Sequence, residues 1–384
     1  MKKIPLARPY FDNEEIRFIS KCLKSGWVTQ GPMVAEFERR FSELHEVKYS
    51  LAINSCTSAL HLACLALGLK PGDEVIVPAF TWVSTANCVE YVGATVKFVD
   101  IDIRTYNIDI NEIEKAITTK TKAIIVVHLF GLSVEMDKII AIAKKYNLKI
   151  IEDAACAIGC KYNGKPVGGI GDIGCFSFHP RKIVTTGEGG MVTTNNRCYA
   201  DIINSLRNHG TRGPEPGPRV MNYPYEMSAI SNIGYNLRLS DIQGAVGIAQ
   251  LLKLNKLLEK RKYIGDCYNF FLRDIDELEL PYVSDKASHT YQSYVVRLKI
   301  KNKNYRNSIM TYLANKGVWT RPGTHAIPRL DVYKKRYNFN LAYFPNAILG
   351  EDMTISLPIY YEIKERELRY ITNTFKTALC NYKI

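Results

Sequence analysis

The sequence contains no C-x-x-C pair, and its ten cysteines are scattered along the chain without a regular spacing. Cys156 and Cys160 are the closest two, which gives no support to a zinc site or to a framework of disulfide bonds. Long hydrophobic runs are also missing, because stretches such as residues 123–127 have the length of a strand and cannot span a membrane. Two prolines and an arginine interrupt the first nine residues, so we expect no signal peptide. These absences predict a cytoplasmic protein with reduced cysteines, no metal ion and no membrane partner.

Acidic residues are too few to balance the basic ones, and the formal net charge is +13 at pH 7. The basic residues are spread along the whole chain, and the sharpest cluster is only residues 334–336. No basic stripe interleaved with aromatic residues and no helix-turn-helix pattern occurs, so we expect no nucleic-acid partner. A general positive field would attract a small anionic substrate that carries phosphate.

The length of 384 residues exceeds the usual size of a single hydrophobic core and predicts two domains. We assign residues 1–250 to a large cofactor-binding domain with an N-terminal segment, and residues 251–384 to a smaller C-terminal α+β domain. A helix over residues 240–263 is expected to connect them. The second domain is expected to contain a strand over residues 291–298 and a loop-rich segment over residues 320–345.

Strand-like and helix-like segments alternate in the first two-thirds of the chain. This alternation predicts an α/β fold with a mostly parallel central sheet and helices on both of its faces. The expected strands are residues 50–54, 74–78, 95–99, 122–127 and 148–152, and the expected helices are residues 33–45, 57–68, 82–92, 111–118 and 135–146. In such sheets the functional groups collect at the carboxyl ends of the strands.

Two charged residues stand at positions where one cofactor chemistry needs them. Asp153 directly follows the expected strand 148–152, and Lys182 comes just before the loop of residues 185–190. A lysine can hold pyridoxal phosphate as a Schiff base, and an aspartate can keep the ring nitrogen of this cofactor protonated. Each residue alone has an ordinary alternative, a surface lysine or a strand-end acid. The combination of the two favours the cofactor.

Small polar residues at a strand-to-helix turn, residues 54–60, offer a site for phosphate. A helix N-terminus presents free N–H groups and the positive end of the helix dipole. Simple capping by Ser55 or Thr57 is an equally good interpretation of this turn taken alone. Ser177 could supply a hydroxyl to the same phosphate, and Trp82 could stack on a flat cofactor ring. The alternative for Trp82 is a place in the core.

Residues 169–174 match the pattern G-x-G-x-x-G, but the match does not predict a dinucleotide site. A dinucleotide fingerprint opens a helix, whereas the strand-like residues 175–178 follow here. The glycines are interpreted as residues that allow tight turns near the site. The histidines form no metal-ligand pair at helical spacing, and His128 and His209 are expected to be structural.

Several segments together resemble the DegT/StrS family of pyridoxal-phosphate sugar aminotransferases, which have the aspartate-aminotransferase-like fold, called fold type I. The likeness runs in order from about residue 5 to residue 375. The segments that carry it are residues 71–78, 152–155, 176–182, 186–190, 234–238 and 356–358.

The resemblance implies a role for each of several residues. Lys182 would form the Schiff base and move protons, and Asp153 would pair with the pyridine nitrogen. Trp82 would stack on the ring. The residues implied to hold the phosphate are Cys56, Thr57 and Ser177 from one chain and Asn236 from the neighbouring subunit, which requires at least a homodimer with shared active sites.

Two positions depart from the pattern of the family. Cys156 stands where relatives often have a hydrogen-bonding Gln or His near the phenolic oxygen of the cofactor. Because a thiol is a weak donor, the partner of that oxygen is an open question. Cys56 replaces the more usual glycine of the phosphate turn.

The resemblance implies transamination from L-glutamate to a keto-sugar, most often a nucleotide-linked 4-keto-6-deoxyhexose. One alternative is a related dehydratase, which has a histidine in place of Lys182. Others are a different ketone, such as a small phosphorylated ketone or a free keto-sugar, and a non-catalytic member of the family. We expect the loop of residues 320–325 to decide the substrate, with Arg321 and His325 as candidate contacts. A structural ion pair is the alternative for Arg321. The sequence does not identify the sugar, its nucleotide or the carbon that is aminated.

Overall fold

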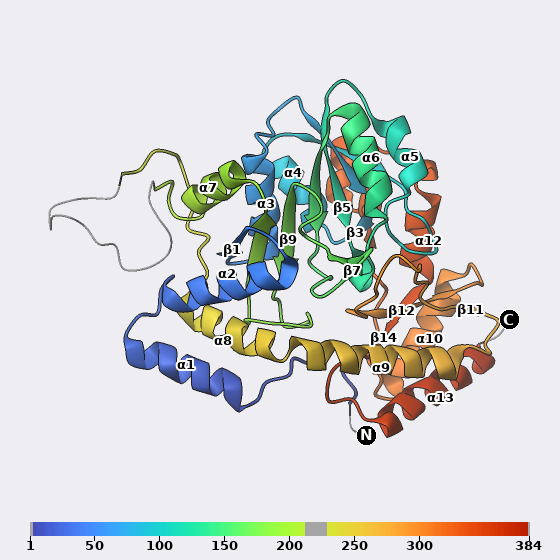
Figure 1. The fold of residues 1–384 in the computed structure, drawn as a ribbon. Helices are drawn as coiled ribbons and strands as arrows, with labels where there is room; N and C mark the ends of the chain where they lie inside the picture. Colours follow the sequence, from blue (N-terminus) through green and yellow to red (C-terminus); the bar gives the residue numbers. More distant parts are fainter. Residues whose placement is uncertain (1–2, 212–228, 383–384) are drawn as a thin grey trace.

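The computed structural model describes residues 3–211 and 229–382. Its centre is a seven-stranded sheet with the strand order β1-β10-β9-β6-β5-β2-β4 (Figure 1). Only β10 runs antiparallel to the other strands of this sheet. The strands are β1 (Tyr49–Ile53), β2 (Glu74–Pro78), β4 (Thr95–Val99), β5 (Thr121–Val127), β6 (Lys149–Asp153), β9 (Ile173–Ser177) and β10 (Gly190–Thr194). The predicted mostly parallel sheet is confirmed.

Both faces of the sheet are covered by helices, because successive residues of its central strands are apolar and point to opposite faces. Ile125 of β5 belongs to one buried cluster, and Ile124 belongs to another. The first cluster includes residues of α3 (Cys56–Ala66), α4 (Ser84–Tyr91) and α7 (Arg197–Leu206). The second includes residues of α2 (Pro32–His45), α5 (Ile110–Ala116), α6 (Met136–Tyr146) and α8 (Asp241–Leu252).

A third buried cluster lies almost entirely in the C-terminal part of the chain. It includes residues of a three-stranded antiparallel sheet made of β11 (Leu278–Glu279), β12 (Tyr294–Leu298) and β14 (Thr354–Leu357). The helices α9 (Leu254–Leu272), α10 (Lys303–Asn315) and α13 (Glu365–Asn381) contribute to the same cluster. The division at residue 250 stays a prediction, and residues 1, 2, 212–228, 383 and 384 of the two expected domains lie outside the described residues.

The expected helix over residues 240–263 is wrong in its extent, because α8 ends and α9 begins on either side of Lys253. The side chain of Lys253 is buried there and forms ion pairs with Asp12 and Glu15. Glu15 lies on α1 (Asn13–Ser25), a helix that begins with a capping box between Asp12 and Glu15. Figure 1 shows α8 and α9 following one another along the lower side of the molecule.

Two further expectations for the second domain need correction. The strand expected over residues 291–298 begins only at Tyr294, since Tyr291 has a left-handed backbone with φ of 49°. The loop-rich segment contains regular elements: β13 (His325–Ala326), η2 (Ile327–Arg329), α11 (Asp331–Tyr337), η3 (Leu341–Tyr343) and the start of α12 (Pro345–Met353). The remaining short elements are β3 (Phe80–Thr81), η1 (Leu129–Gly131), β7 (Lys161–Tyr162) and β8 (Lys165–Pro166).

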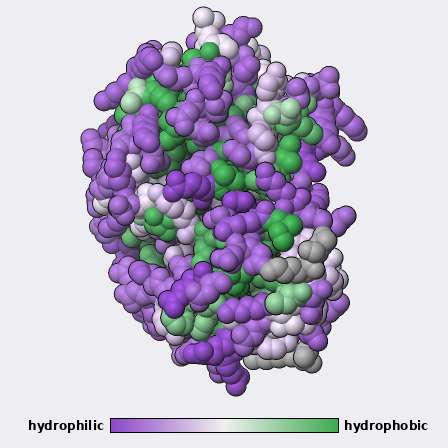
Figure 2. Space-filling view, turned by 90° about the vertical axis from the view of Figure 1, so that its right-hand side faces the viewer, coloured by the Kyte–Doolittle hydropathy of each residue, from purple (hydrophilic) through white to green (hydrophobic). Residues whose placement is uncertain are grey.

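The surface on the right-hand side of Figure 1 is mostly hydrophilic, with hydrophobic residues in separate patches (Figure 2). Among the described residues, no helix combines the length and the apolar character that crossing a membrane requires.

Candidate active site

The carboxyl ends of three parallel strands meet at a cavity of about 290 Å³. Val127, Asp153 and Ser177 end β5, β6 and β9, and all three line this cavity. Its volume is close to the lower end of the roughly 300–1,000 Å³ that small-molecule sites have. The sheet therefore brings two of the predicted residues, Asp153 and Ser177, to one place.

Asp153 is buried, and two hydrogen bonds orient its carboxylate. Thr85 donates from Oγ1 to Oδ2 at 2.7 Å, and the backbone N–H of Ala155 donates to Oδ1 at 3.1 Å. Burial raises the pKa of Asp153, while these hydrogen bonds and the nearby charge of Lys182 act in the opposite direction. A buried carboxylate with these partners can receive a cationic or proton-bearing ring nitrogen.

Lys182 follows β9 in a tight turn that its own backbone N–H closes by donating to His179 at 2.8 Å. Its Nζ lies 3.0 Å from Sγ of Cys156. Burial disfavours the ammonium form of Lys182, but the neighbouring Cys156, Cys56 and Asp153 outweigh this effect and its pKa is raised. Lys182 and Asp153 line the same cavity, so the amine and the carboxylate come together as the sequence predicts.

The first turn of α3 forms another wall of the cavity. Ser55 caps the helix by accepting a 3.1 Å hydrogen bond from the backbone N–H of Ser58. Helix geometry leaves the N–H groups of Cys56 and Thr57 without acceptors inside the helix, and both residues line the cavity. A Cβ on Gly190 would lie 2.7 Å from the backbone nitrogen of Cys56, so the close approach of β10 to this turn requires glycine. The wall can therefore bind an anion such as phosphate.

Trp82 lies at the rim of the cavity, with 56% of its surface exposed. This exposure rules out the alternative of a core tryptophan. The ring of His325 lies 5.7 Å from that of Trp82, and its Nδ1 lies 3.6 Å from Oε1 of Glu351. His325 itself is not among the residues that line the cavity.

Arg321 lines the cavity and donates from Nη2 to the carbonyl oxygen of Gly323 at 2.9 Å. Burial and the nearby charge of Arg181 lower the pKa of Arg321. Within residues 3–211 and 229–382, Arg321 forms no ion pair with a carboxylate, so its alternative role in a structural ion pair is not seen. Asn236 is exposed and pairs with Asn208 in an isolated bridge, so a single chain does not bring Asn236 to the cavity.

Among the residues that line the cavity, sequence reasoning gave no role to Thr85, Arg181, Gln292 and Ser356. Thr85 stands on α4, three residues after Trp82, and only its contact with Asp153 reveals its place. Arg181 and Ser356 lie in the segments 176–182 and 356–358, which carry the resemblance to the family, but the sequence alone assigns no role to either residue. No local pattern marks Gln292.

The glycine-rich residues 169–174 hold a buried carboxylate. The backbone N–H groups of Gly168, Ile170 and Gly171 donate to Glu152 at 2.6–2.8 Å. His128 contacts Glu152 through Nε2 at 2.9 Å, and its Nδ1 accepts from a backbone N–H. The glycines therefore serve tight turning, and His128 is structural, as the sequence predicts.

The residues of the cavity fit pyridoxal phosphate. The helix end of Cys56 and Thr57 suits its phosphate, Asp153 suits its ring nitrogen, and Lys182 offers the amine that its aldehyde needs. Ser177 adds a hydroxyl, whose oxygen now accepts a 3.4 Å hydrogen bond from the N–H of His179. No group of three or more His, Cys, Asp or Glu residues in the described part of the chain could hold a metal ion.

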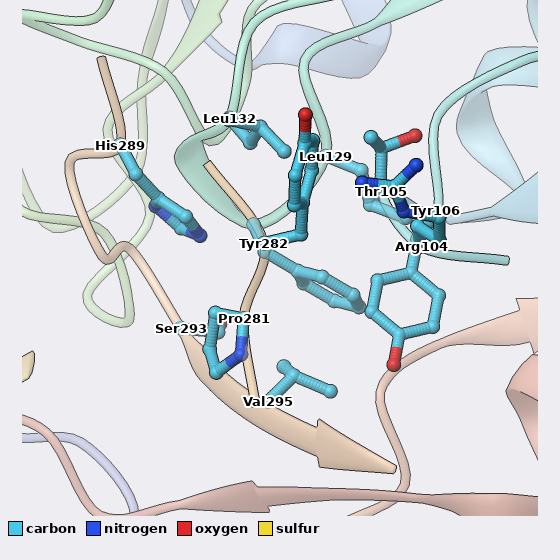
Figure 3. Close-up of a pocket in the computed structure, with 11 residues that line it drawn as sticks. Arg104, Thr105, Tyr106, Leu129, Leu132, Pro281, Tyr282, His289, Ser293 and Val295 are labelled. Atoms are coloured by element: carbon cyan, nitrogen blue, oxygen red, sulfur yellow. The ribbon is translucent and has the colours of Figure 1, made fainter. Parts of the chain in front are cut away.

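A second cavity lies beside the first but is too small for a cofactor. Figure 3 shows Tyr282 among its lining residues, and the guanidinium carbon of Arg104 lies 4.2 Å from the centre of this ring. The volume of about 10 Å³ is hardly enough for one water molecule. The candidate site is therefore the larger cavity.

The chain is similar to several known proteins over nearly its whole length. The chain is 35% identical to GDP-perosamine synthase of Escherichia coli O157:H7 over 376 residues, which cover 97% of each chain. It is 36% identical to the spore coat polysaccharide biosynthesis protein SpsC of Bacillus subtilis, with 95% of this chain and 94% of the relative covered.

A solved structure has the same architecture. The sugar aminotransferase Spr1654 of Streptococcus pneumoniae, described as putative and solved in its PLP-form, matches with a TM-score of 0.92 and 31% identity, and each chain is covered completely. A PMP-form of the same protein matches equally well. The predicted pyridoxal-phosphate-dependent aminotransferase of fold type I is confirmed. Because residues 9–376 also match the family as a whole, the chain belongs to the DegT/DnrJ/EryC1/StrS aminotransferase family.

Proposed function

We propose that this chain transfers an amino group from L-glutamate to a nucleotide-linked 4-keto-6-deoxyhexose, in the cytoplasm, for the biosynthesis of a surface glycan. The observation that carries the proposal is that Lys182, Asp153 and the N-terminus of α3 line one cavity. The relative named GDP-perosamine synthase supports a nucleotide-linked sugar, and the relative named for spore coat polysaccharide supports a role in surface-glycan biosynthesis. The net charge of +13 suits an anionic substrate.

Different residues of the cavity hold different parts of the cofactor. Cys56 and Thr57 bind its phosphate through backbone N–H groups, and Ser177 adds a hydroxyl. Asp153 pairs with the ring nitrogen, and Trp82 covers one face of the ring from the rim. When bound, pyridoxal phosphate supplies an electron sink that stabilises negative charge on the carbon next to the transferred nitrogen.

Lys182 moves the protons of the reaction. Its Nζ accepts the α-proton of the amino donor and returns a proton to the acceptor carbon in the second half of the cycle. Asp153 is held in place by Thr85 and Ala155, so its charge meets the ring nitrogen without reorganisation. Trp82 and the neighbouring His325 border the entrance, where the sugar would contact them.

A homodimer would complete the site with Asn236 of the second subunit. Asn236 is exposed in the single chain and lies on a segment with strongly exposed apolar side chains. Ile230 is 67% exposed and Ile233 is 96% exposed. A second copy that covered these side chains could bring its Asn236 to the phosphate end of the cavity.

The test is to supply the cofactor-loaded protein with L-glutamate and a panel of nucleotide-linked keto-sugars, and to detect amino sugars by mass spectrometry. We expect an amino sugar from a 4-keto-6-deoxyhexose and an absorbance change on adding glutamate alone. No absorbance change with glutamate would refute the donor. Product formation only from a phosphorylated ketone or a free keto-sugar would refute the acceptor.

A further inference from the structure

Two reactive side chains of different kinds meet at one side of the cavity. The Sγ atom of Cys156 lies 3.0 Å from Nζ of Lys182, and both residues line the cavity. Cys156 stands in the turn after β6, and Lys182 stands in the turn after β9. Because β6 and β9 are neighbouring parallel strands, the sheet itself brings the thiol and the amine together.

Hydrogen bonds of the main chain hold both turns in place. The N–H of Ala157 donates to the carbonyl oxygen of Ala154 at 2.9 Å, which closes the turn that carries Cys156. The N–H of Lys182 donates to the carbonyl oxygen of His179 at 2.8 Å. The backbone therefore places the sulfur and the nitrogen at a separation typical of atoms that react with each other, roughly 3–3.5 Å.

Cys156 differs from the cysteines near it in its access to solvent. Cys156 is only half-buried and lines the cavity. Burial raises the pKa of Cys56 and of Cys175 well above the ordinary value, so neither of these thiols forms at neutral pH the thiolate that oxidants attack. Lys182 contacts Cys156, and Arg321 is close enough for its charge to interact with that of Cys156. Partly exposed cysteines beside cations are the ones that react with oxidants.

We propose that Cys156 and Lys182 form a modification site, at which oxidation by a peroxide joins the two side chains through a covalent bond between sulfur and nitrogen. In the first step hydrogen peroxide oxidises the thiol to a sulfenic acid and is reduced to water. In the second step the amine nitrogen attacks the sulfur, so that the S–N bond forms and the S–O bond breaks. The hydroxyl group leaves with a proton from the nitrogen as a second water molecule. The protein has then lost two hydrogen atoms, and the peroxide has accepted both electrons.

The first step prepares the amine for the second. Burial disfavours the ammonium form of Lys182, and Cys156 is the main neighbour that opposes this effect and raises the pKa of Lys182. An uncharged, oxidised sulfur no longer opposes it. Burial then favours the neutral amine, which is the form that attacks sulfur.

The modification competes with the cofactor for Lys182. In the proposed function this amine is bound to the aldehyde of pyridoxal phosphate, and it is free while the cofactor carries the amino group. The S–N bond can therefore form only in the second of these states, and it prevents the return to the first. This dependence on the state of the cofactor rests on the proposed function.

A thiol reductant reverses the modification. One thiol attacks the sulfur of Cys156 and releases the amine of Lys182. A second thiol frees the sulfur and leaves the reductant as a disulfide. The pair is thus a reversible switch that inactivates the protein under oxidising conditions.

The experiment compares the two states of the cofactor-loaded protein. Hydrogen peroxide is added with and without L-glutamate, and the peptides that contain residues 156 and 182 are analysed by mass spectrometry without a reductant. A third sample is first treated with hydroxylamine, which removes the cofactor and frees Lys182 without an amino donor. Cys156→Ser is the test variant. Cys198→Ser is the matched control, because Cys198 is exposed on α7 and does not line the cavity.

We expect a cross-linked pair of peptides that is lighter than the two separate peptides by two hydrogen atoms. It should be at least about tenfold more abundant with glutamate than without it, because the cofactor otherwise blocks the amine. The sample treated with hydroxylamine should contain it too, and dithiothreitol should remove it. Cys156→Ser should form no cross-link, and Cys198→Ser should not differ from the wild type.

The outcomes separate this inference from the proposed function. A sample with free Lys182 in which Cys156 stays reduced, or becomes a sulfinic acid or a disulfide with Cys56, would overturn the inference and leave the proposed function intact. A cross-link after hydroxylamine treatment, with no absorbance change on adding glutamate, would support the inference and refute the proposed amino donor. Equal amounts of cross-link with and without glutamate would support the modification and contradict the proposed bond between Lys182 and the cofactor.

Discussion

Gln292 forms hydrogen bonds to the main chain on both sides of Lys182. Its Nε2 donates to the carbonyl oxygen of Arg181 at 2.7 Å, and its Oε1 accepts from the backbone N–H of Ile183 at 3.0 Å. Gln292 is in turn held by Arg261, whose Nη1 donates to its carbonyl oxygen at 3.1 Å. Burial lowers the pKa of Arg261 to about 10, and within residues 3–211 and 229–382 no carboxylate pairs with it. A residue from the C-terminal part of the chain thus fixes the loop that carries the reactive amine.

The first prediction concerns the two side-chain hydrogen bonds of Gln292. Gln292→Met should lower kcat about tenfold and destabilise the fold by about 1–3 kcal/mol, because a buried and a partly buried peptide group lose their partners. Gln292→Glu keeps the acceptor for Ile183 but loses the donor for Arg181, so its kcat should lie above that of Gln292→Met. Steady-state kinetics and urea unfolding check both effects. An unchanged kcat in both variants would show that the hydrogen bonds of Gln292 are not needed to position the loop.

The second prediction concerns the amine itself. Lys182→Ala should abolish the covalent link between cofactor and protein, and it should lower turnover by at least about 100-fold, since the group that moves protons is removed. The link is detected by borohydride reduction followed by peptide mass spectrometry. Lys165→Ala is the control, because Lys165 is exposed and lies outside the cavity. A labelled peptide that does not contain residue 182 would contradict the assignment.

The third prediction tests the homodimer. Ile233→Asp should weaken self-association at least tenfold, because burying a carboxylate in an apolar contact is unfavourable. Val332 is 60% exposed on α11, and Val332→Asp serves as the control for an apolar-to-acidic change elsewhere on the surface. Analytical ultracentrifugation measures the dissociation constants. A wild-type protein that is monomeric at micromolar concentration would refute the shared active site.

A change at Asn236 tests cofactor binding separately from dimer formation. Asn236→Ala should lower the affinity for pyridoxal phosphate while the dimer persists, because the asparagine is proposed to reach the phosphate across the interface. Fluorescence titration with the cofactor measures this affinity. Equal affinity in the variant and the wild type would remove Asn236 from the site.

Much of the large domain could be predicted because its signals are local. The apolar runs that become β5 and β6 fix the parallel strands, and a strand that ends in Asp153 must carry this residue to the same edge as its neighbours. The capping box of Asp12 and Glu15 is an equally local signal, and it predicts the start of α1.

The remaining features depend on contacts between distant segments. The helix expected over residues 240–263 is interrupted at Lys253, which forms ion pairs with residues more than 200 positions earlier in the sequence. The helix-like sequence pattern of α8 continues into α9, so the sequence does not mark this interruption. Gln292 reaches Arg181 across 111 positions, and Arg321 is joined to Ser356 by pairing in the C-terminal part of the chain. Such contacts are set by the packing of the whole molecule, so no local spacing could reveal them.

The last prediction concerns the dependence of stability on pH. His45 is buried on α2, where Nδ1 donates to the carbonyl oxygen of Val167 at 2.9 Å and the ring stacks on Phe41. Its Nε2 has no partner, and burial lowers the pKa of His45 to about 4. In the unfolded chain the same group takes up a proton near its ordinary pKa of about 6.5.

Proton uptake by the unfolded chain therefore reduces the free energy of unfolding as the pH falls from about 6.5 to about 4. Between pH 7 and pH 5 the contribution of His45 to this loss is about 2 kcal/mol. His45→Phe, which keeps an aromatic ring against Phe41, should remove this part of the pH dependence. Urea unfolding at both pH values and one protein concentration measures it. His289, whose pKa burial lowers to about 3, is present in both proteins, so its contribution cancels in the comparison. An identical loss of stability in the variant and the wild type would show that His45 does not remain neutral in the folded protein.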